Sequence, residues 1–178
     1  MTDGSFDGEH TMRFERRLAH PPERVWSAIS DPAELEHWLG RVEGEVAAGE
    51  SVVVTWLNSD DEGSTAVMTA AVTACEPPRT LELTGDIHGT LRFELEPDGA
   101  GTRLRFSVDM ARESIDEVTL FLAGWHIHLD HLESALDGDR VDWERWDEVH
   151  RPRWDEHHSR YVAAAEASER QPGRQRRP

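Results

Sequence analysis

The sequence contains no lysine, so all 19 of its basic residues are arginines. They stand against 36 acidic residues, which gives a formal net charge of -17. A surface this negative repels nucleic acid and anionic membranes, so we expect neither as a partner. It is typical of a halophilic protein whose self-repulsion is screened by salt. The lack of lysine also fits the codon usage of a GC-rich genome, and both explanations stay open.

Cysteine, long apolar runs and catalytic motifs are also scarce. Cys75 is the only cysteine, so no disulfide can form within one chain. No apolar run is long enough to span a bilayer, and the first ten residues do not read as a secretory signal. We therefore expect a cytoplasmic protein. Because the chain has no GxSxG elbow, Walker loop or dinucleotide fingerprint, we predict no catalytic residue and no cofactor.

Apolar and polar residues alternate over much of the first two thirds of the chain. The pattern predicts a strand over 12–18, two short helices that begin at Pro22 and Pro32, and then six short strands. Such alternation is typical of antiparallel strands with one solvent-facing side. From Ser114 to Leu136 the apolar period becomes that of a long helix. Its stripe contains Val118, Trp125, Leu129, Leu132 and Leu136.

Residues 14–39, FERRLAHPPERVWSAISDPAELEHWL, resemble the N-terminal signature of the SRPBCC (START/Bet v-like) superfamily. They are most similar to its branch of activators of the heat-shock protein 90 ATPase. The resemblance covers about residues 11–138 and implies an α+β helix-grip fold. In that fold a curved antiparallel sheet of about seven strands wraps around a long C-terminal helix. The shared positions are Arg16, Pro21-Pro22, Val25-Trp26, Ser30-Asp31-Pro32 and Trp38.

The resemblance also implies a gap between the sheet and the long helix, which the superfamily uses for lipids, polyketides and similar ligands. We therefore predict a non-enzymatic protein that binds an apolar or amphipathic small molecule. Two alternatives are a co-chaperone-like interaction module and a cyclase or hydrolase. Alternation alone cannot distinguish cavity-lining residues from solid core. The predicted ligand-binding residues are Arg16, Trp38, Met68, Val72, Leu83, Leu91, Phe93, Leu104, Phe106, Trp125, His128 and Leu129.

Arg16 is the charged member of this set. It shares a strand face with Met12, Phe14 and Leu18, so its guanidinium is expected to point inward and to need a partner. That partner is either a ligand carboxylate or an acidic residue near the edge of the strand.

Three histidines lie within six positions of the long helix. Each helical residue turns by about 100°, so His126 and His128 point in nearly opposite directions and cannot share one metal ion. His128 and His131 could share a face, but two ligands fall short of the four of a structural zinc site. We place His131 on the outside of the helix and the other two beside its apolar stripe. Asp130 and Glu133 are expected to point elsewhere, so we predict no metal.

The chain ends outside the resemblance are interpreted separately. We predict a disordered leader over 1–10, a tryptophan-rich helical extension over 139–167 and a disordered tail over 168–178. The extension is expected to cover Leu120 and Ile127 on the back of the long helix, or to close the pocket mouth. The alternative is a flap that binds a protein partner or forms a homodimer.

Overall fold

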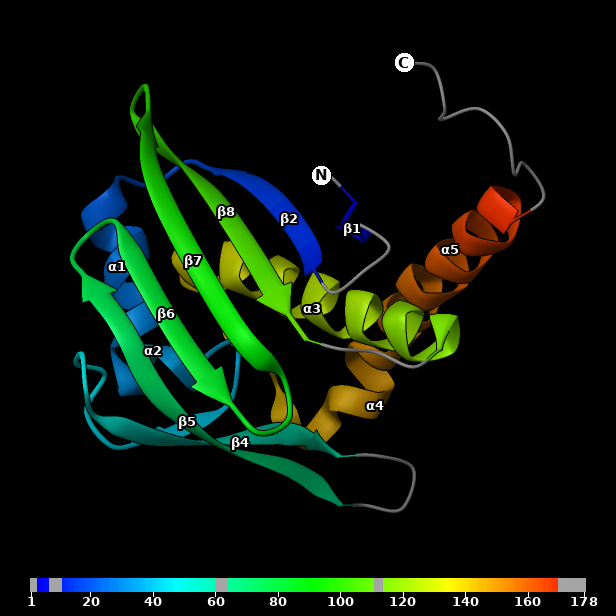
Figure 1. Cartoon of the computed structure of the whole chain (residues 1–178), viewed down its shortest axis with the longest axis horizontal. Helices are drawn as coiled ribbons and strands as arrows, with labels where there is room; N and C mark the ends of the chain where they lie inside the picture. The colour runs from blue at the N-terminus through cyan, green and yellow to red at the C-terminus, as the bar shows by residue number, and fades with distance from the viewer. Residues whose placement is uncertain (1–2, 7–10, 60–63, 111–113, 170–178) are drawn as a thin grey trace.

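The computed structural model describes residues 3–6, 11–59, 64–110 and 114–169 (Figure 1). One antiparallel sheet of eight strands, ordered β1-β2-β8-β7-β6-β5-β4-β3, curves around the long helix α3. The predicted α+β helix-grip fold is confirmed. The strands are β1 Ser5–Phe6, β2 Thr11–Leu18, β3 Arg41–Glu43, β4 Ser51–Ser59, β5 Thr65–Glu76, β6 Thr80–Gly85, β7 Gly89–Asp98 and β8 Gly101–Asp109. The helices are α1 Pro22–Ser30, α2 Pro32–Leu35, α3 Ile115–Leu136, the 3-10 turn η1 Trp143–Arg145, α4 Trp146–Val149 and α5 Arg151–Glu169.

The strand count differs from the prediction because of β1. Ser5 pairs with Arg13 and Phe6 with Met12, so part of the expected leader extends the sheet. Two residues are too short to show alternation, and the sequence therefore gave no strand signal there. The disordered tail was predicted over 168–178, and its part beyond Glu169 lies outside the described residues.

The inner face of the sheet follows the alternation of the sequence. Along β2 the even-numbered residues from Met12 to Leu18 are buried, and the odd-numbered ones from Arg13 to Arg17 are exposed. The strand register extends this alternation of buried and exposed residues to β8, where Phe106 pairs with Phe14. Residues paired across strands point to the same face, so their side chains form one continuous core under α3.

Local sequence signals fix both ends of α3. The Ser114 side chain accepts a hydrogen bond from the Glu117 backbone, and the Glu117 side chain accepts one from the Ser114 backbone. This reciprocal capping satisfies two free N–H groups at the helix start. Gly138, with φ of 101°, follows the last turn, a backbone conformation that favours glycine.

The extension packs on the back of α3. The rings of His126 on α3 and His157 on α5 stack with centroids 3.9 Å apart. Ile127, which was predicted to need cover, is 1% exposed, whereas Leu120 remains 43% exposed. Within the described residues, no helix combines the length and apolar character needed to cross a membrane.

Candidate ligand groove and buried polar cluster

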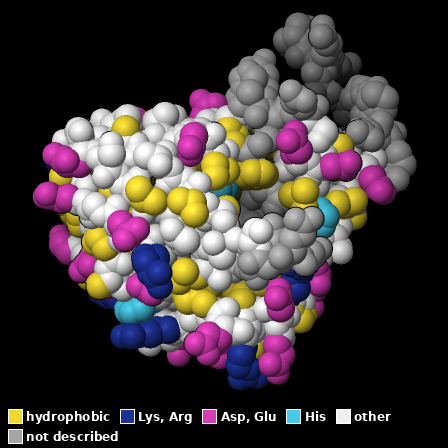
Figure 2. Space-filling view, turned by 90° about the horizontal axis from the view of Figure 1, so that it is seen from below, with side chains coloured by type: hydrophobic (Ala, Val, Ile, Leu, Met, Phe, Trp, Pro, Cys, Tyr) yellow, Lys and Arg dark blue, Asp and Glu magenta, His cyan; other side chains and the backbone are white. Residues whose placement is uncertain are grey.

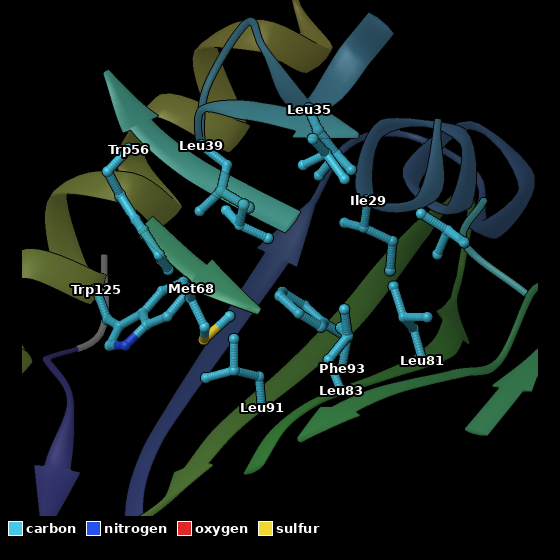
Figure 3. Close-up of a pocket in the computed structure, with 13 residues that line it drawn as sticks. Ile29, Leu35, Leu39, Trp56, Met68, Leu81, Leu83, Leu91, Phe93 and Trp125 are labelled. Carbon is cyan, nitrogen blue, oxygen red and sulfur yellow. The ribbon is translucent and has the colours of Figure 1, made fainter. Parts of the chain in front are cut away.

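The gap between the sheet and α3 is almost filled. Its interior cavity has a volume of about 30 Å³ and a wholly apolar lining, shown in Figure 3. That volume accommodates little more than a water molecule. Of the predicted ligand-binding residues, the lining includes Met68, Leu83, Leu91, Phe93 and Trp125. The buried core elsewhere contains Trp38, Val72, Leu104, Phe106 and Leu129.

A larger hollow opens beside this cavity, and we call it the aromatic groove. It has a volume of about 390 Å³ and lies where β4, the β6–β7 turn, α3 and the extension meet. Figure 2 shows this side of the molecule, where hydrophobic side chains border a hollow. The aromatic side chains that line the groove are Trp56, His88, Phe121, Trp125, Trp146 and Trp154, together with His128.

His88 is at the centre of the aromatic contacts. Its ring centroid lies 4.6 Å from that of Trp56, 5.0 Å from Phe121 and 5.3 Å from Trp125. These distances fall in the range of favourable ring pairs, so the contacts hold the walls in place. Trp56 and Trp125 line both the groove and the interior cavity, so these two side chains separate the two spaces.

The tautomer of His128 is fixed by the backbone. Its Nδ1 lies 3.0 Å from the carbonyl oxygen of Trp38, which can only accept a hydrogen bond. Nδ1 therefore carries the proton, and the lone pair is on Nε2. Burial lowers the pKa of His128 to about 4, against the opposing effect of the Trp38 hydrogen bond, so the ring is neutral near pH 7. His128, predicted as a ligand-binding residue, lines the groove.

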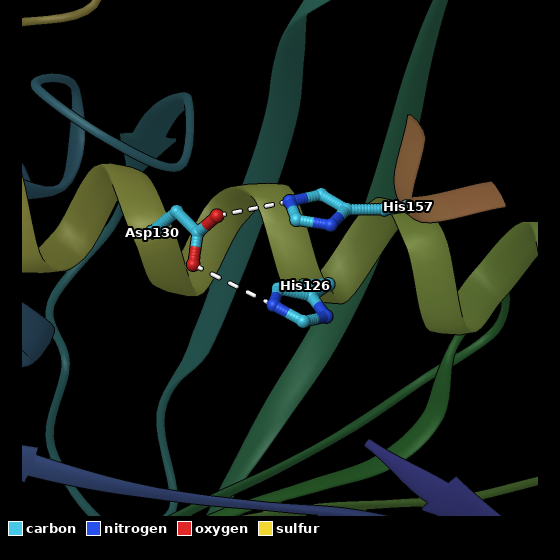
Figure 4. A group of neighbouring side chains, drawn as sticks. All are labelled: His126, Asp130 and His157. Carbon is cyan, nitrogen blue, oxygen red and sulfur yellow. Dashed lines mark hydrogen bonds and ion pairs between the residues drawn. The ribbon is translucent and has the colours of Figure 1, made fainter. Parts of the chain in front are cut away.

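A buried polar cluster lies on the opposite side of α3, against α5 (Figure 4). His157 Nε2 is 2.9 Å from Asp130 Oδ2, and His126 Nε2 is 3.7 Å from Asp130 Oδ1. Within the described part of the chain, these three residues form the one group whose ligand atoms converge enough to hold a metal ion. Asp130 was predicted to point away from the His128 and His131 pair, and its contacts in the structure are with His126 and with His157 of the extension.

The hydrogen bonds around this cluster place a proton on each imidazole nitrogen that faces Asp130. Arg160, which can only donate, lies 2.8 Å from His157 Nδ1, so the proton of His157 is on Nε2. Burial raises the pKa of Tyr161 to about 12, so its hydroxyl stays protonated. That hydroxyl accepts from the Gly4 N–H and donates to His126 Nδ1, both at 2.7 Å. Neither histidine therefore offers a lone pair at the position of the metal.

Arginines complete the cluster. Arg16 is 3% exposed, with its guanidinium 3.2 Å from Glu133 and 3.7 Å from Asp130. Arg153 Nε and NH2 lie 3.0 Å and 2.9 Å from Asp130 Oδ2. The inward orientation of Arg16 was predicted, and its partners in the structure are acidic residues of α3. Two guanidinium groups beside Asp130 also repel a metal cation.

His131 was predicted to lie on the outside of α3, and this was wrong, since it is 6% exposed. The extension covers it: the His150 ring lies 4.6 Å away and the Trp143 ring 6.2 Å away. The helical periodicity of α3 carries no information about a later segment of the chain that folds back and covers this helix.

We expect protein purified without added metal to contain no stoichiometric zinc, because of these proton positions and arginines. Elemental analysis of the native protein checks this. One zinc per chain, lost on His157→Ala but retained on His37→Ala, would show that the cluster is a metal site.

The curved sheet around α3, with the proline-led helix pair after β2, defines a helix-grip domain of the SRPBCC type. The family model described as Activator of Hsp90 ATPase homolog 1-like protein matches residues 19–137, and the chain belongs to this family.

Solved structures show the same fold. CalU16 from Micromonospora echinospora is 21% identical, with 86% of each chain covered and a TM-score of 0.65. Protein MLL2253 from Mesorhizobium loti is 29% identical over 74% of this chain and 99% of its own, with a TM-score of 0.61. DynU16, from the dynemicin biosynthetic locus, is 21% identical over 75% of this chain and 51% of its own, with a TM-score of 0.65. Among curated proteins, no relative matches the chain.

Proposed function

We propose that the protein binds a small amphipathic molecule in the aromatic groove, without chemical conversion. The available space supports this proposal: the groove measures about 390 Å³ and the interior cavity about 30 Å³. Sites for small molecules are typically apolar hollows of roughly 300–1,000 Å³ with a few polar groups. The groove meets this description, and the interior cavity is far smaller.

The extension is part of the proposed site. Trp146 of α4 and Trp154 of α5 line the groove together with Trp56 of β4. Ligand binding would therefore engage both the family domain and the segment after it. A cyclase or hydrolase is disfavoured, because a general base works best with a pKa near the working pH. The pKa of His128, the groove histidine with a fixed tautomer, is lowered by burial to about 4.

Gly124 offers a way to block the groove while preserving the fold. It lines the groove from within α3, and a Cβ added there would meet no heavy atom within 4 Å apart from its chain neighbours and the adjacent backbone of its own helix. We expect Gly124→Leu to reduce the affinity for prodan, a neutral fluorescent probe, at least about ten-fold. Leucine is favoured over glycine inside a helix by about 0.8–1 kcal/mol, so stability should be retained or raised. Fluorescence titration and urea unfolding of the same samples measure both effects.

Gly124→Ala is the matched control, because it gives the same helical benefit with a side chain too short to fill the groove. It should retain the affinity of the native protein for prodan. If the leucine variant is folded and binds prodan as tightly as the native protein, the ligand does not occupy the groove and the proposal fails.

A further inference from the structure

We infer that the aromatic groove selects a planar, uncharged aromatic molecule that carries both a carbonyl oxygen and a hydroxyl group, a hydroxylated aryl ketone, over a fatty acid. This inference rests on the proposed function and adds the chemical class of the ligand. It is derived from polar atoms at the groove whose hydrogen-bonding capacity is unused.

Two indole groups supply unused donors. The Nε1 atoms of Trp125 and Trp146 are buried and have no hydrogen-bond partner among the described residues. Other indoles of this chain are satisfied by carbonyl groups: Trp38 Nε1 donates to Ala28 O at 2.9 Å, and Trp143 Nε1 donates to Glu36 O at 2.8 Å. Both unsatisfied indoles belong to groove-lining residues. A buried donor without a partner is unfavourable, so an acceptor oxygen at this place would be stabilised.

In Figure 3 the indole nitrogen of Trp125 lies at the edge of its ring that points away from Leu83 and Phe93. The interior cavity has an apolar lining and offers this nitrogen no acceptor. The acceptor that Trp125 lacks must therefore come from another direction, and the groove is the hollow that borders the same ring.

Two acceptors face the same space. Asn58 Oδ1 is buried and has no hydrogen-bond partner in the described part of the chain. His128 has its proton on Nδ1, bound to the Trp38 carbonyl, so its Nε2 can only accept. Both residues line the groove. A ligand hydroxyl satisfies such an acceptor, whereas a hydrocarbon or a carboxylate cannot donate to it.

The charges near the groove favour a neutral ligand. Among the described residues that line it, Arg151 is the one with a positive charge, and Asp147 and Asp155 lie 4.0 Å and 3.8 Å from its guanidinium. Its charge is therefore largely offset, while the net charge of -17 repels anions over the whole surface. A fatty acid carboxylate would lose hydration without gaining an unopposed cation.

The test compares three naphthalenes of similar size and shape. One carries a hydroxyl and an acetyl group, one carries only the acetyl group, and ethylnaphthalene carries neither. We expect each added group to tighten binding roughly ten-fold, as measured by quenching of tryptophan fluorescence. Dodecanoate, as a fatty acid probe, should bind more weakly than the hydroxyketone.

Substitutions assign the two preferences to their residues. Trp146→Phe keeps an aromatic wall and removes one donor, so the preference for the acetyl group should fall. Asn58→Leu should reduce the preference for the hydroxyl. Trp143→Phe is the matched control in the extension and should preserve both preferences, because Trp143 does not line the groove and its Nε1 already donates to Glu36 O.

The outcomes separate this inference from the proposed function. Equal binding of the three naphthalenes, or tighter binding of dodecanoate, with sensitivity to Gly124→Leu would overturn the ligand class and leave the groove as the binding site. If no probe binds, or if Gly124→Leu changes nothing, the proposed function fails as well. If the preferences for the acetyl and hydroxyl groups persist in both Trp146→Phe and Asn58→Leu, other atoms recognise these groups of the ligand.

Discussion

The protein should lose stability steeply as the pH falls below about 6.5, by roughly 4 kcal/mol per pH unit. Burial lowers the pKa of three histidines of α3, to about 3 for His126, about 4 for His128 and about 3 for His131. In the unfolded chain each takes up a proton near pH 6.5. In the folded chain each stays neutral, so this stability is complete above pH 6.5. It is lost as the pH falls toward 4, by about 1.4 kcal/mol per pH unit for each histidine.

Urea unfolding between pH 7.5 and 5 measures this slope. Burial also raises the pKa of Glu133, which acts with the opposite sign, but its window lies near and above the ordinary pKa of glutamate, about 4.3. His131→Gln should reduce the slope by about 1.4 kcal/mol per pH unit, since the proton of His131 no longer contributes. His37→Gln, at a half-buried position outside α3, should leave it unchanged. A free energy of unfolding that is flat over this range would contradict neutral burial of the three rings.

Asp130→Asn should destabilise the protein by about 3–5 kcal/mol, the usual effect of removing one partner from a buried ion cluster. Burial opposes ionisation of Asp130, but the His157 hydrogen bond and the nearby positive charge prevail and lower its pKa. Asparagine would remove the ion pair between Arg16 and Asp130 and weaken the contacts of Arg153 and His157. Since both latter residues belong to α5, the extension should loosen first.

Asp137→Asn is the control for this substitution. Asp137 lies at the end of the same helix and pairs with His20 at 2.8 Å, but its side chain is 72% exposed. An exposed pair of this kind contributes less than about 1 kcal/mol. Thermal and urea unfolding of the two variants gives the comparison. If Asp130→Asn is no more destabilising than Asp137→Asn, the buried cluster does not hold the extension in place.

The fold could be predicted because its signals are local. Alternation along β2, the proline starts of α1 and α2, and the Ser114 cap each depend on a few neighbouring residues. The elements that these local signals predict are present in the structure because the tertiary packing favours the same backbone conformations. The strand at Ser5–Phe6 was missed, since it depends on pairing with β2 and carries no local pattern.

The groove could be predicted only in part, because segments distant in the chain form it. Trp125 and His128 were identified from the resemblance, and the extension was singled out for its tryptophans. Nothing in the sequence singled out Trp56 or His88, since the approach of β4 to the β6–β7 turn and α3 depends on the curvature of the whole sheet. Alternation correctly placed Phe106 and Leu104 inside, but inward direction does not distinguish a filled core from a lined cavity.

Because Trp56 and Trp125 line both the interior cavity and the groove, substitutions at these two positions would change the size of the proposed ligand site. The curvature of a sheet changes only through many coordinated substitutions, whereas the thickness of the partition between these two spaces depends on two side chains. A relative with a small residue at either position would join the two spaces into one deep chamber on an unchanged scaffold. Divergence in the preference for the proposed ligand could therefore proceed in single mutational steps.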